Sequence, residues 1–405
     1  MQHRYFAASN SAEGFKNYYA EVFSRADFVY IIKGGPGTGK SSLMKKYSRA
    51  AEERGEVCEY YYCSSDPSSL DGVLIFGEHG AIGMLDGTSP HVCEPKFPGA
   101  REQIINLGEC WDVSLLHKQK NEIIALSERK SAAYKNAYTY LRSVGNLRAV
   151  SDGFLSEAVN FDKLRAVASR LVKDLPHGRA RTVPSILDSV SMSGRVRLTT
   201  FEENAEKLYI ISDFHGLGKI FLTELYAALR DRDVSARVSY DPICSERVDG
   251  IFLEREKIAF VSLADAQEKY GELKKSCNSC ARGGGLSSGD VRDGATLSVN
   301  ERFGGLSSGD GGKSAALCEN GGAALTTGGR EVLFINAKRF IDTEKLRDIR
   351  GELRYTERLA QSSLDGALHA LAGAKIYHFL LEDIYGKAMD WSKFEKMCAD
   401  LCGKI

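Results

Sequence analysis

The chain has 405 residues and a mass of 44.5 kDa, more than one average domain, which predicts two or three domains. Hydrophobic residues make up 43% and charged residues 27%, so the composition excludes a chain that is disordered throughout. Lys and Arg total 54, as do Asp and Glu, and this balance excludes a global field that attracts nucleic acid or an anionic membrane. We therefore expect any polyanion to be held at a local site.

The first ten residues, MQHRYFAASN, lack the apolar core of a secretory signal. No window of the sequence has the roughly 18 apolar residues of a membrane span. The ten cysteines are scattered along the chain, so reduced thiols are expected. Together these features predict a cytoplasmic protein without a membrane-bound segment.

A glycine-rich loop between a predicted strand (28–32) and a predicted helix (42–51) is the most specific motif. Residues 34–41, GGPGTGKS, fit the pattern G-x-x-x-x-G-K-[ST] of a Walker A phosphate loop. The glycines let successive backbone N–H groups converge on phosphate oxygens, and the following helix N-terminus favours negative charge. The predicted nucleotide-binding residues are Gly34, Gly35, Pro36, Gly37, Thr38, Gly39, Lys40, Ser41 and Ser42.

Two residues of this loop have predicted chemical roles. Lys40 would neutralise the β and γ phosphates of ATP, and the Ser41 hydroxyl would bind Mg²⁺. Magnesium also needs a carboxylate, normally an Asp at the end of an apolar strand. Asp86 directly follows the apolar run 81–85 and meets this requirement, whereas Asp71 precedes an apolar run and is interpreted as structural.

The segment after Asp86 brings His91 to the edge of the predicted sheet where open α/β sheets bind ligands. His91 could orient water or substrate in catalysis, or it could be an ordinary hydrogen-bonded loop histidine. Lys96 and Arg101 could supply a mobile positive charge to the γ-phosphate, although a solvated charged surface is the commoner role. The candidates for activating water are Glu78, Glu94 and His91.

Beyond this site, residues 113–144 and 162–175 have apolar residues at helical spacing and predict a helical tail. The strands 56–63 and 81–85 alternate with helices, which favours an α/β fold. With the phosphate loop, this pattern predicts a three-layer P-loop NTPase fold with a mainly parallel sheet.

The chain also contains an internal duplication. Residues 34–41 align with 213–220 at an offset of 179, and the helical segments 158–164 and 388–394 align at an offset of 230. We therefore predict a first repeat, 1–176, with an intact loop and a second repeat, 177–405, with a degenerate one. A Gly/Ser-rich insertion at about 281–330, in which GGLSSGD occurs twice, accounts for the change of offset and is expected to be flexible.

The two repeats differ at the predicted magnesium ligands. Ile220 aligns with Ser41, and Ala264 aligns with Asp86, so both ligands are missing from the second repeat unless the alignment slips by one residue to Asp265. Asp249, in contrast, preserves Asp71, which supports a structural role for that pair. The joint loss indicates that Ser41 and Asp86 share a function and that each chain binds one nucleotide.

With these residues in hand, the chain resembles a family of bacterial tandem P-loop ATPases. The resemblance rests on GGPGTGKSS (34–42), LDGTSPH (85–91), PGAREQIINLGECWD (98–112) and the second loop, and it covers nearly the whole chain except the insertion. It implies nucleotide binding and ATP hydrolysis, with Lys40, Ser41 and Asp86 as the residues to carry over. It implies no pathway, and the degenerate second loop departs from it.

The leading hypothesis is an ATP- and Mg²⁺-dependent protein that hydrolyses ATP slowly, or only when a partner or the other repeat supplies a missing charge. A phosphotransferase that passes the γ-phosphate to a small acceptor is an alternative. A nucleotide-gated switch with negligible turnover is a third possibility. The expected ligand is a nucleotide, with no strong nucleic-acid signal, and a protein partner or oligomer stays open.

Overall fold

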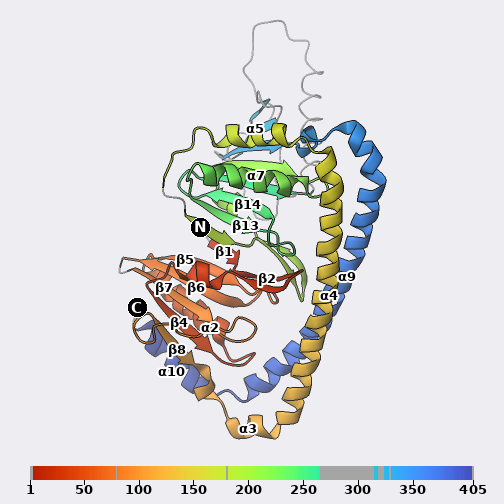
Figure 1. The fold of residues 1–405 in the computed structure, drawn as a ribbon. Coiled ribbons are helices and arrows are strands. Elements are labelled where there is room, and N and C mark those ends of the chain that lie inside the picture. The colour runs from red at the N-terminus through yellow and green to blue at the C-terminus, as the bar shows by residue number, and fades with distance from the viewer. Residues whose placement is uncertain are drawn as a thin grey trace.

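The computed structural model describes residues 3–78, 80–178, 181–264, 314–317, 323–327 and 330–403. It contains two similar mixed α/β domains, one above the other in Figure 1, with two long helices that run along both. We call them the first sheet domain (β1 to β8, α1 and α2) and the second sheet domain (β9 to β18, α6 and α7).

The first sheet domain has six strands in the order β1-β5-β6-β7-β4-β8. β6 pairs antiparallel with β5 and with β7, whereas the other three pairings are parallel. A short hairpin, β2 and β3, follows β1. The bounds are β1 (His3–Phe6), β2 (Ala8–Ser11), β3 (Gly14–Asn17), α1 (Tyr19–Phe23), β4 (Phe28–Lys33), α2 (Lys40–Glu53), β5 (Val57–Tyr62), β6 (Leu70–Gly77), β7 (Gly80–Asp86), β8 (Glu102–Asn106) and the 3₁₀ helix η1 (Leu107–Cys110).

The second sheet domain repeats this plan, since β9-β13-β14-β15-β12-β18 have the same order and the same parallel and antiparallel pairings. Two further strands, β16 and β17, extend the sheet beyond β18. The bounds are β9 (Thr182–Ser185), β10 (Asp188–Ser191), β11 (Gly194–Arg197), α6 (Thr200–Asn204), β12 (Lys207–Ser212), α7 (Leu217–Asp231), β13 (Ala236–Tyr240), β14 (Val248–Leu253), β15 (Ile258–Leu263), β16 (Ser314–Leu317), β17 (Ala323–Thr327), β18 (Arg330–Ile335) and η2 (Ala337–Phe340). The duplication is therefore structural.

The predicted Gly/Ser insertion at about 281–330 is described only in part. Residues 265–313 lie outside the described residues, so flexibility of that stretch stays a prediction. Its C-terminal part contributes β16 and β17.

Local sequence explains the strand–loop–helix unit of the first sheet domain. Apolar residues dominate β4, whose Ile31 and Ile32 are buried. In α2, buried residues recur at positions 43, 44, 47, 48 and 51, which is one face of an amphipathic helix packed on the sheet. The two faces together form a continuous core.

The helical tails are longer than the sequence pattern suggests. α3 (Val113–Lys118) is followed by α4 (Lys120–Ala158), which continues well beyond the predicted end at residue 144. Gly145 lies inside α4, where a Cβ would come within 2.7 Å of the Ala12 Cβ. A glycine that is unfavourable for an isolated helix is thus needed for close packing against the β2–β3 hairpin.

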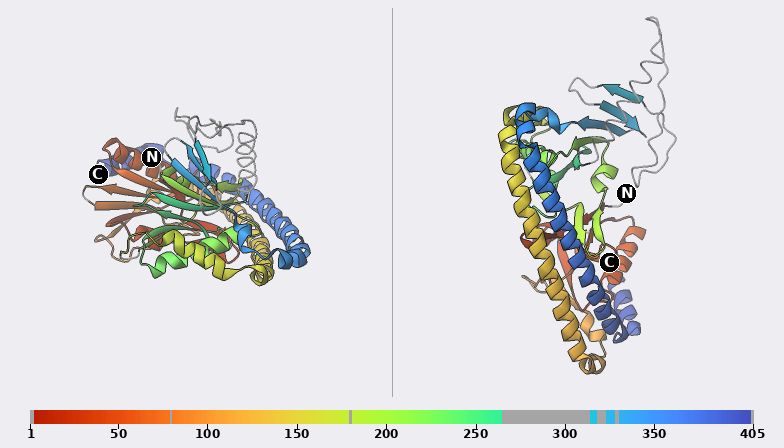
Figure 2. Two further views of the ribbon diagram at one scale, coloured as in Figure 1. Left: turned by 90° about the horizontal axis from the view of Figure 1, so that it is seen from above. Right: turned by 90° about the vertical axis from the view of Figure 1, so that its right-hand side faces the viewer.

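The tails also exchange between the repeats. α4 packs along α9 (Thr343–Lys387) over most of its length, as Figures 1 and 2 show. At their ends, α5 (Phe161–Val172) from the first repeat packs on α7, and α10 (Trp391–Cys402) from the second repeat packs on α2. Each sheet domain is therefore covered by a helix of the other repeat, and the predicted boundary near residue 176 divides the sequence but not the packing.

Backbone hydrogen bonds fix the two crossing points in matching ways. The Asp112 N–H donates to Ala388 O at 2.7 Å, and at the other crossing the Asp342 N–H donates to Ala158 O at 2.9 Å. Asn160 and Asp390 then cap α5 and α10, because their side chains accept from backbone N–H groups of the first turn. The exchange is built from local cap signals in the sequence.

A buried ion pair joins the two sheet domains. Arg237 on β13 is fully buried and donates to Glu59 Oε1 on β5 at 2.6 Å. Arg25 is the second cation on Glu59, with its Nη1 2.6 Å from Glu59 Oε2. The Arg237 guanidinium lies 4.3 Å from the Tyr5 ring centroid. Burial alone would raise the pKa of Glu59, but Arg237 and Arg25 outweigh it and lower that pKa to about 2.

No helix in the described part of the chain is long and apolar enough to cross a membrane.

We predict that Glu59→Gln lowers the free energy of unfolding by about 3–5 kcal/mol, because it leaves the Arg237 charge buried without its main partner. The matched control is Glu254→Gln, which removes the half-exposed second partner of the same arginine, 2.7 Å from its Nε, and should cost less than about 1 kcal/mol. Chemical denaturation of the full chain measures both. Equal losses in the two variants would contradict the importance given to the buried pair.

Candidate phosphate-binding pocket

The Gly34–Ser41 loop lies at the carboxyl end of β4 and opens into a cavity of about 1110 Å³. One wall is the loop with the ends of β6 and β7, and the opposite wall is α4. The residues of α4 that line it recur at helical spacing: Ser127, Lys130, Ser131, Tyr134, Lys135, Tyr138, Thr139 and Arg142. The cavity is large enough for a nucleotide-sized ligand.

Every predicted nucleotide-binding residue except Gly35 lines this cavity. The Lys40 ammonium is half-buried; it donates to Gly35 O at 2.7 Å and lies 3.6 Å from Asp86 Oδ2. The Ser41 hydroxyl accepts from the Leu70 N–H at 3.0 Å. The loop thus brings an ammonium and a hydroxyl to the same cavity as the strand-end carboxylate.

Helices of the second repeat pack directly on this loop. A Cβ on Gly35 would come within 2.8 Å of Tyr385 on α9, and one on Gly37 within 2.6 Å of Glu382 O. Gly37 and Gly39 also have positive φ values of 67° and 87°, which side chains rarely adopt. Glycine is therefore required here by packing and backbone conformation, in addition to any ligand.

Three buried groups form a cluster beside the loop. Asp71, Asp86 and His91 offer ligand atoms that all lie within 4.8 Å of one another. Asp86 Oδ1 accepts from the Thr88 hydroxyl at 2.6 Å, while Asp71 Oδ2 accepts from the Tyr19 hydroxyl at 3.1 Å. Burial, and to a smaller extent the Asp86 charge, raises the pKa of Asp71 against the opposing effect of His91.

His91 is held by aromatic packing and by Asp71. Its ring centroid lies 5.3 Å from those of Phe15 and Tyr19, and its Nε2 lies 3.5 Å from Asp71 Oδ2. Its Nδ1 is buried and has no hydrogen-bond partner in the described part of the chain. That nitrogen consequently has an unused capacity for a hydrogen bond.

Several other sequence candidates lie away from the cavity. Glu78, Glu94, Lys96 and Arg101 are not among its lining residues. Glu94 pairs with Lys33 at 2.6 Å, and Arg101 donates to the Ala26 carbonyl at 3.1 Å. The Lys and Arg residues outside the loop that line the cavity, Lys130, Lys135 and Arg142, come from α4, where the sequence gives no motif to separate them from ordinary surface charges.

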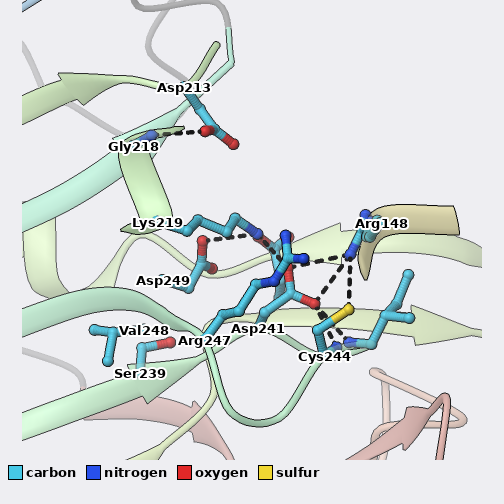
Figure 3. Close-up of polar contacts among 12 residues, drawn as sticks. Arg148, Asp213, Gly218, Lys219, Ser239, Asp241, Cys244, Arg247, Val248 and Asp249 are labelled. Atoms are coloured by element: carbon cyan, nitrogen blue, oxygen red, sulfur yellow. Dashed lines mark hydrogen bonds and ion pairs between the residues drawn. The ribbon is translucent and has the colours of Figure 1, made fainter. Parts of the chain in front are cut away.

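The corresponding loop of the second sheet domain is filled by its own side chains (Figure 3). Asp213 stands where Gly34 is in the first loop, and its Oδ1 accepts from the Gly218 N–H at 3.0 Å. Lys219, the counterpart of Lys40, forms ion pairs with Asp241 and with Asp249, the latter at 3.2 Å. The Gly218 N–H and the Lys219 ammonium are thus both bound to carboxylates of the same domain.

Asp241 is the centre of this internal cluster. Arg148, on α4, donates to its Oδ1 at 3.2 Å, and the backbone N–H groups of Ile243 and Cys244 also donate to it at 2.8 Å. Burial alone would raise the pKa of Asp241, but Lys219 and Arg148 outweigh it and hold that pKa below its ordinary value. The cluster is a charge-balanced unit of the fold.

The strand register corrects one sequence alignment. Asp86 was aligned with Ala264, but its counterpart is Ser262, because Leu85 pairs with Gly72 in the first sheet domain and Val261 pairs with Gly250 in the second. The stretch from Gly250 to Val261 is two residues shorter than the matching stretch from Gly72 to Leu85, so a constant offset fails there. A strand-end carboxylate is absent from this position in either alignment.

The chain matches no known family model, no curated protein and no solved structure. These comparisons therefore do not identify the family that the sequence resembles.

We predict that Lys219→Met and Lys40→Met affect stability very differently, although the two lysines occupy equivalent positions. Lys219→Met removes the cation that the buried Asp241 and Asp249 share, so Arg148 and Arg197 balance their charges only in part, and it should lower the free energy of unfolding by about 3–5 kcal/mol. Lys40→Met should cost clearly less, since the nearest carboxylate oxygen is 3.6 Å away. Denaturant titration compares them, and a larger loss in Lys40→Met would refute the internal-cluster interpretation.

Proposed function

We propose that the chain binds ATP with Mg²⁺ at the Gly34–Ser41 loop and hydrolyses the terminal phosphate bond. The observation that carries the proposal is the convergence of Lys40, Ser41 and Asp86 on one cavity, at the end of a strand–loop–helix unit. Backbone N–H groups at the start of α2 and the Lys40 ammonium suit phosphate oxygens. The loop pattern and the resemblance to tandem P-loop ATPases favour the same ligand.

The donor set beside the loop fits a magnesium ion. Asp71 and Asp86 are both buried, and two carboxylates this close to each other favour a bound cation. Asp86 would hold the ion together with Ser41, whereas Asp71 is engaged by Tyr19 and His91. The ion, when bound, would neutralise charge on the phosphates.

Hydrolysis then needs a positioned water. His91 is the best-placed group, because Asp71 lies on its Nε2 side and leaves Nδ1 to accept a hydrogen bond from water. In this reaction the water oxygen bonds to the γ-phosphorus, the bond from that phosphorus to the β-γ bridging oxygen breaks, and ADP, phosphate and a proton result. Lys40 would stabilise the charge that develops on the phosphate oxygens.

The second loop is proposed to bind no nucleotide. Asp213 places a carboxylate where phosphate oxygens would approach, and Lys219 is already neutralised. We therefore expect one nucleotide per chain.

A phosphotransferase is the second candidate, and the size of the cavity favours it. At about 1110 Å³ it exceeds the usual range for a single small ligand, so an acceptor could occupy the α4 side. Phosphate release measured without any acceptor separates the two. Steady release supports hydrolysis, and release of ADP only with an added metabolite supports transfer.

We predict that Lys40→Ala weakens ATP binding by about 100-fold, because it removes a half-buried phosphate counter-charge. The control is Lys46→Ala, which removes an exposed lysine of the same helix that pairs with Glu395. Equilibrium dialysis with labelled ATP gives affinity and stoichiometry together. Two nucleotides per wild-type chain, or unchanged affinity in Lys40→Ala, would contradict the site.

We also predict that Asp86→Asn spares ATP binding without metal but removes the gain in affinity that Mg²⁺ gives, along with turnover. Asn keeps an oxygen for the Thr88 hydrogen bonds, so the loop should hold its shape. Asp66→Asn, a carboxylate that lines the same cavity outside the cluster, is the control. Calorimetric titration with and without Mg²⁺ tests this, and a full Mg²⁺ response in Asp86→Asn would exclude Asp86 as the ligand.

A further inference from the structure

Lys130 on α4 is a half-buried cation that lines the same cavity as the Gly34–Ser41 loop. No hydrogen bond or ion pair reaches its ammonium within the described part of the chain. Burial and the charge of Lys40, opposed by Glu382, lower the pKa of Lys130. Lys130 has no carboxylate partner among the described residues, and the nearest carboxylate oxygen to Lys40, on Asp86, is 3.6 Å away, so the part of the cavity between the two ammonium groups is favourable for an anion.

The second sheet domain shows what such a pair does when an anion is present. There, Lys219 of the loop and Arg148 of α4 both contact the carboxylate of Asp241. The cation from α4 and the cation from the loop are thus bridged by one negative group, as Figure 3 shows.

The first sheet domain lacks that bridging carboxylate. Asp241 follows β13, and the residue that follows β5 at the same point is Cys63. The equivalence is set by backbone contacts, since the Cys63 N–H donates to Ser69 O at 3.0 Å and the Asp241 N–H donates to Arg247 O at 2.9 Å. Cys63 lines the cavity and is too short and uncharged at neutral pH to neutralise Lys40 and Lys130.

We propose that Lys130 is a phosphate-binding residue supplied by the long helix pair, and that the terminal phosphate of the nucleotide bridges it to Lys40 as Asp241 bridges Arg148 to Lys219. The inference rests on the proposed nucleotide site and adds that α4 supplies a contact to the triphosphate. A cation from outside the loop is also what the terminal phosphate needs as its charge redistributes during transfer. Binding then ties α4 to the loop through the ligand.

The test is calorimetric titration of the full chain with ATP, ADP and AMP, for wild type, Lys130→Gln, Lys130→Arg and Arg129→Gln. Arg129 is the neighbouring exposed cation of α4 that does not line the cavity, so it controls for net charge. Lys130→Gln should weaken ATP by at least about tenfold and AMP by less than about twofold, the size expected for one charge-assisted contact. Lys130→Arg should restore most of the ATP affinity, and Arg129→Gln should resemble wild type.

Two results would overturn the inference while leaving the nucleotide site intact. One is an ATP affinity in Lys130→Gln equal to that of wild type. The other is an equal weakening of ATP, ADP and AMP, which would indicate a general change of the pocket and not a contact with the terminal phosphate. A folded wild-type chain that binds none of the three nucleotides would instead overturn the proposed function together with this inference.

Discussion

The exchange of helices between the two repeats is the constraint on which the other features depend. A sheet that leaves an apolar face open to water is not a stable unit, and each sheet domain here covers part of its core with a helix of the other repeat. Leu43 and Tyr47 of α2 belong to the same core as Phe394 and Leu401 of α10. The two domains therefore cannot be separated without exposing both cores, and the long pair of α4 and α9 is the link that makes the exchange possible.

This arrangement also explains why the candidate site is assembled from distant parts of the sequence. The loop and the strand-end carboxylate belong to the first repeat, while α9 and α10, which pack on the loop glycines, belong to the second. A change in the spacing of the helix pair would thus displace the loop through the contacts at Gly35 and Gly37. Any ligand held between the loop and α4 would in turn resist such a change, which is how a local binding event could affect both domains.

The sequence predicted the duplication, the strand before the loop and the helix after it, because a glycine motif between apolar runs is a local signal. It did not predict the exchange, since the apolar faces of α5 and α10 look the same whichever sheet they cover. It did not single out Lys130, because that residue belongs to no motif and only the structure shows that it lines the cavity. The interpretation of Asp71 as structural relied on its counterpart Asp249, yet the structure places Asp71 beside Asp86 and His91, and Asp249 beside Lys219. A preserved residue type had different neighbours in the two domains.

The ion pair between Glu59 and Arg237 affects which repeat each sheet domain can pack against. The edge strands β1 and β9 meet through reciprocal hydrogen bonds between Phe6 and Ile186, and the residues three positions before these, His3 and Val183, lie opposite Glu59 and Arg237 respectively. Glu59 and Arg237 are thus equivalent positions. A dimer of identical single repeats would place the same charge at both and repel, whereas one chain with two repeats can place opposite charges there. The pair is accordingly a specificity element: each sheet domain is complementary to the other and disfavours a second copy of itself.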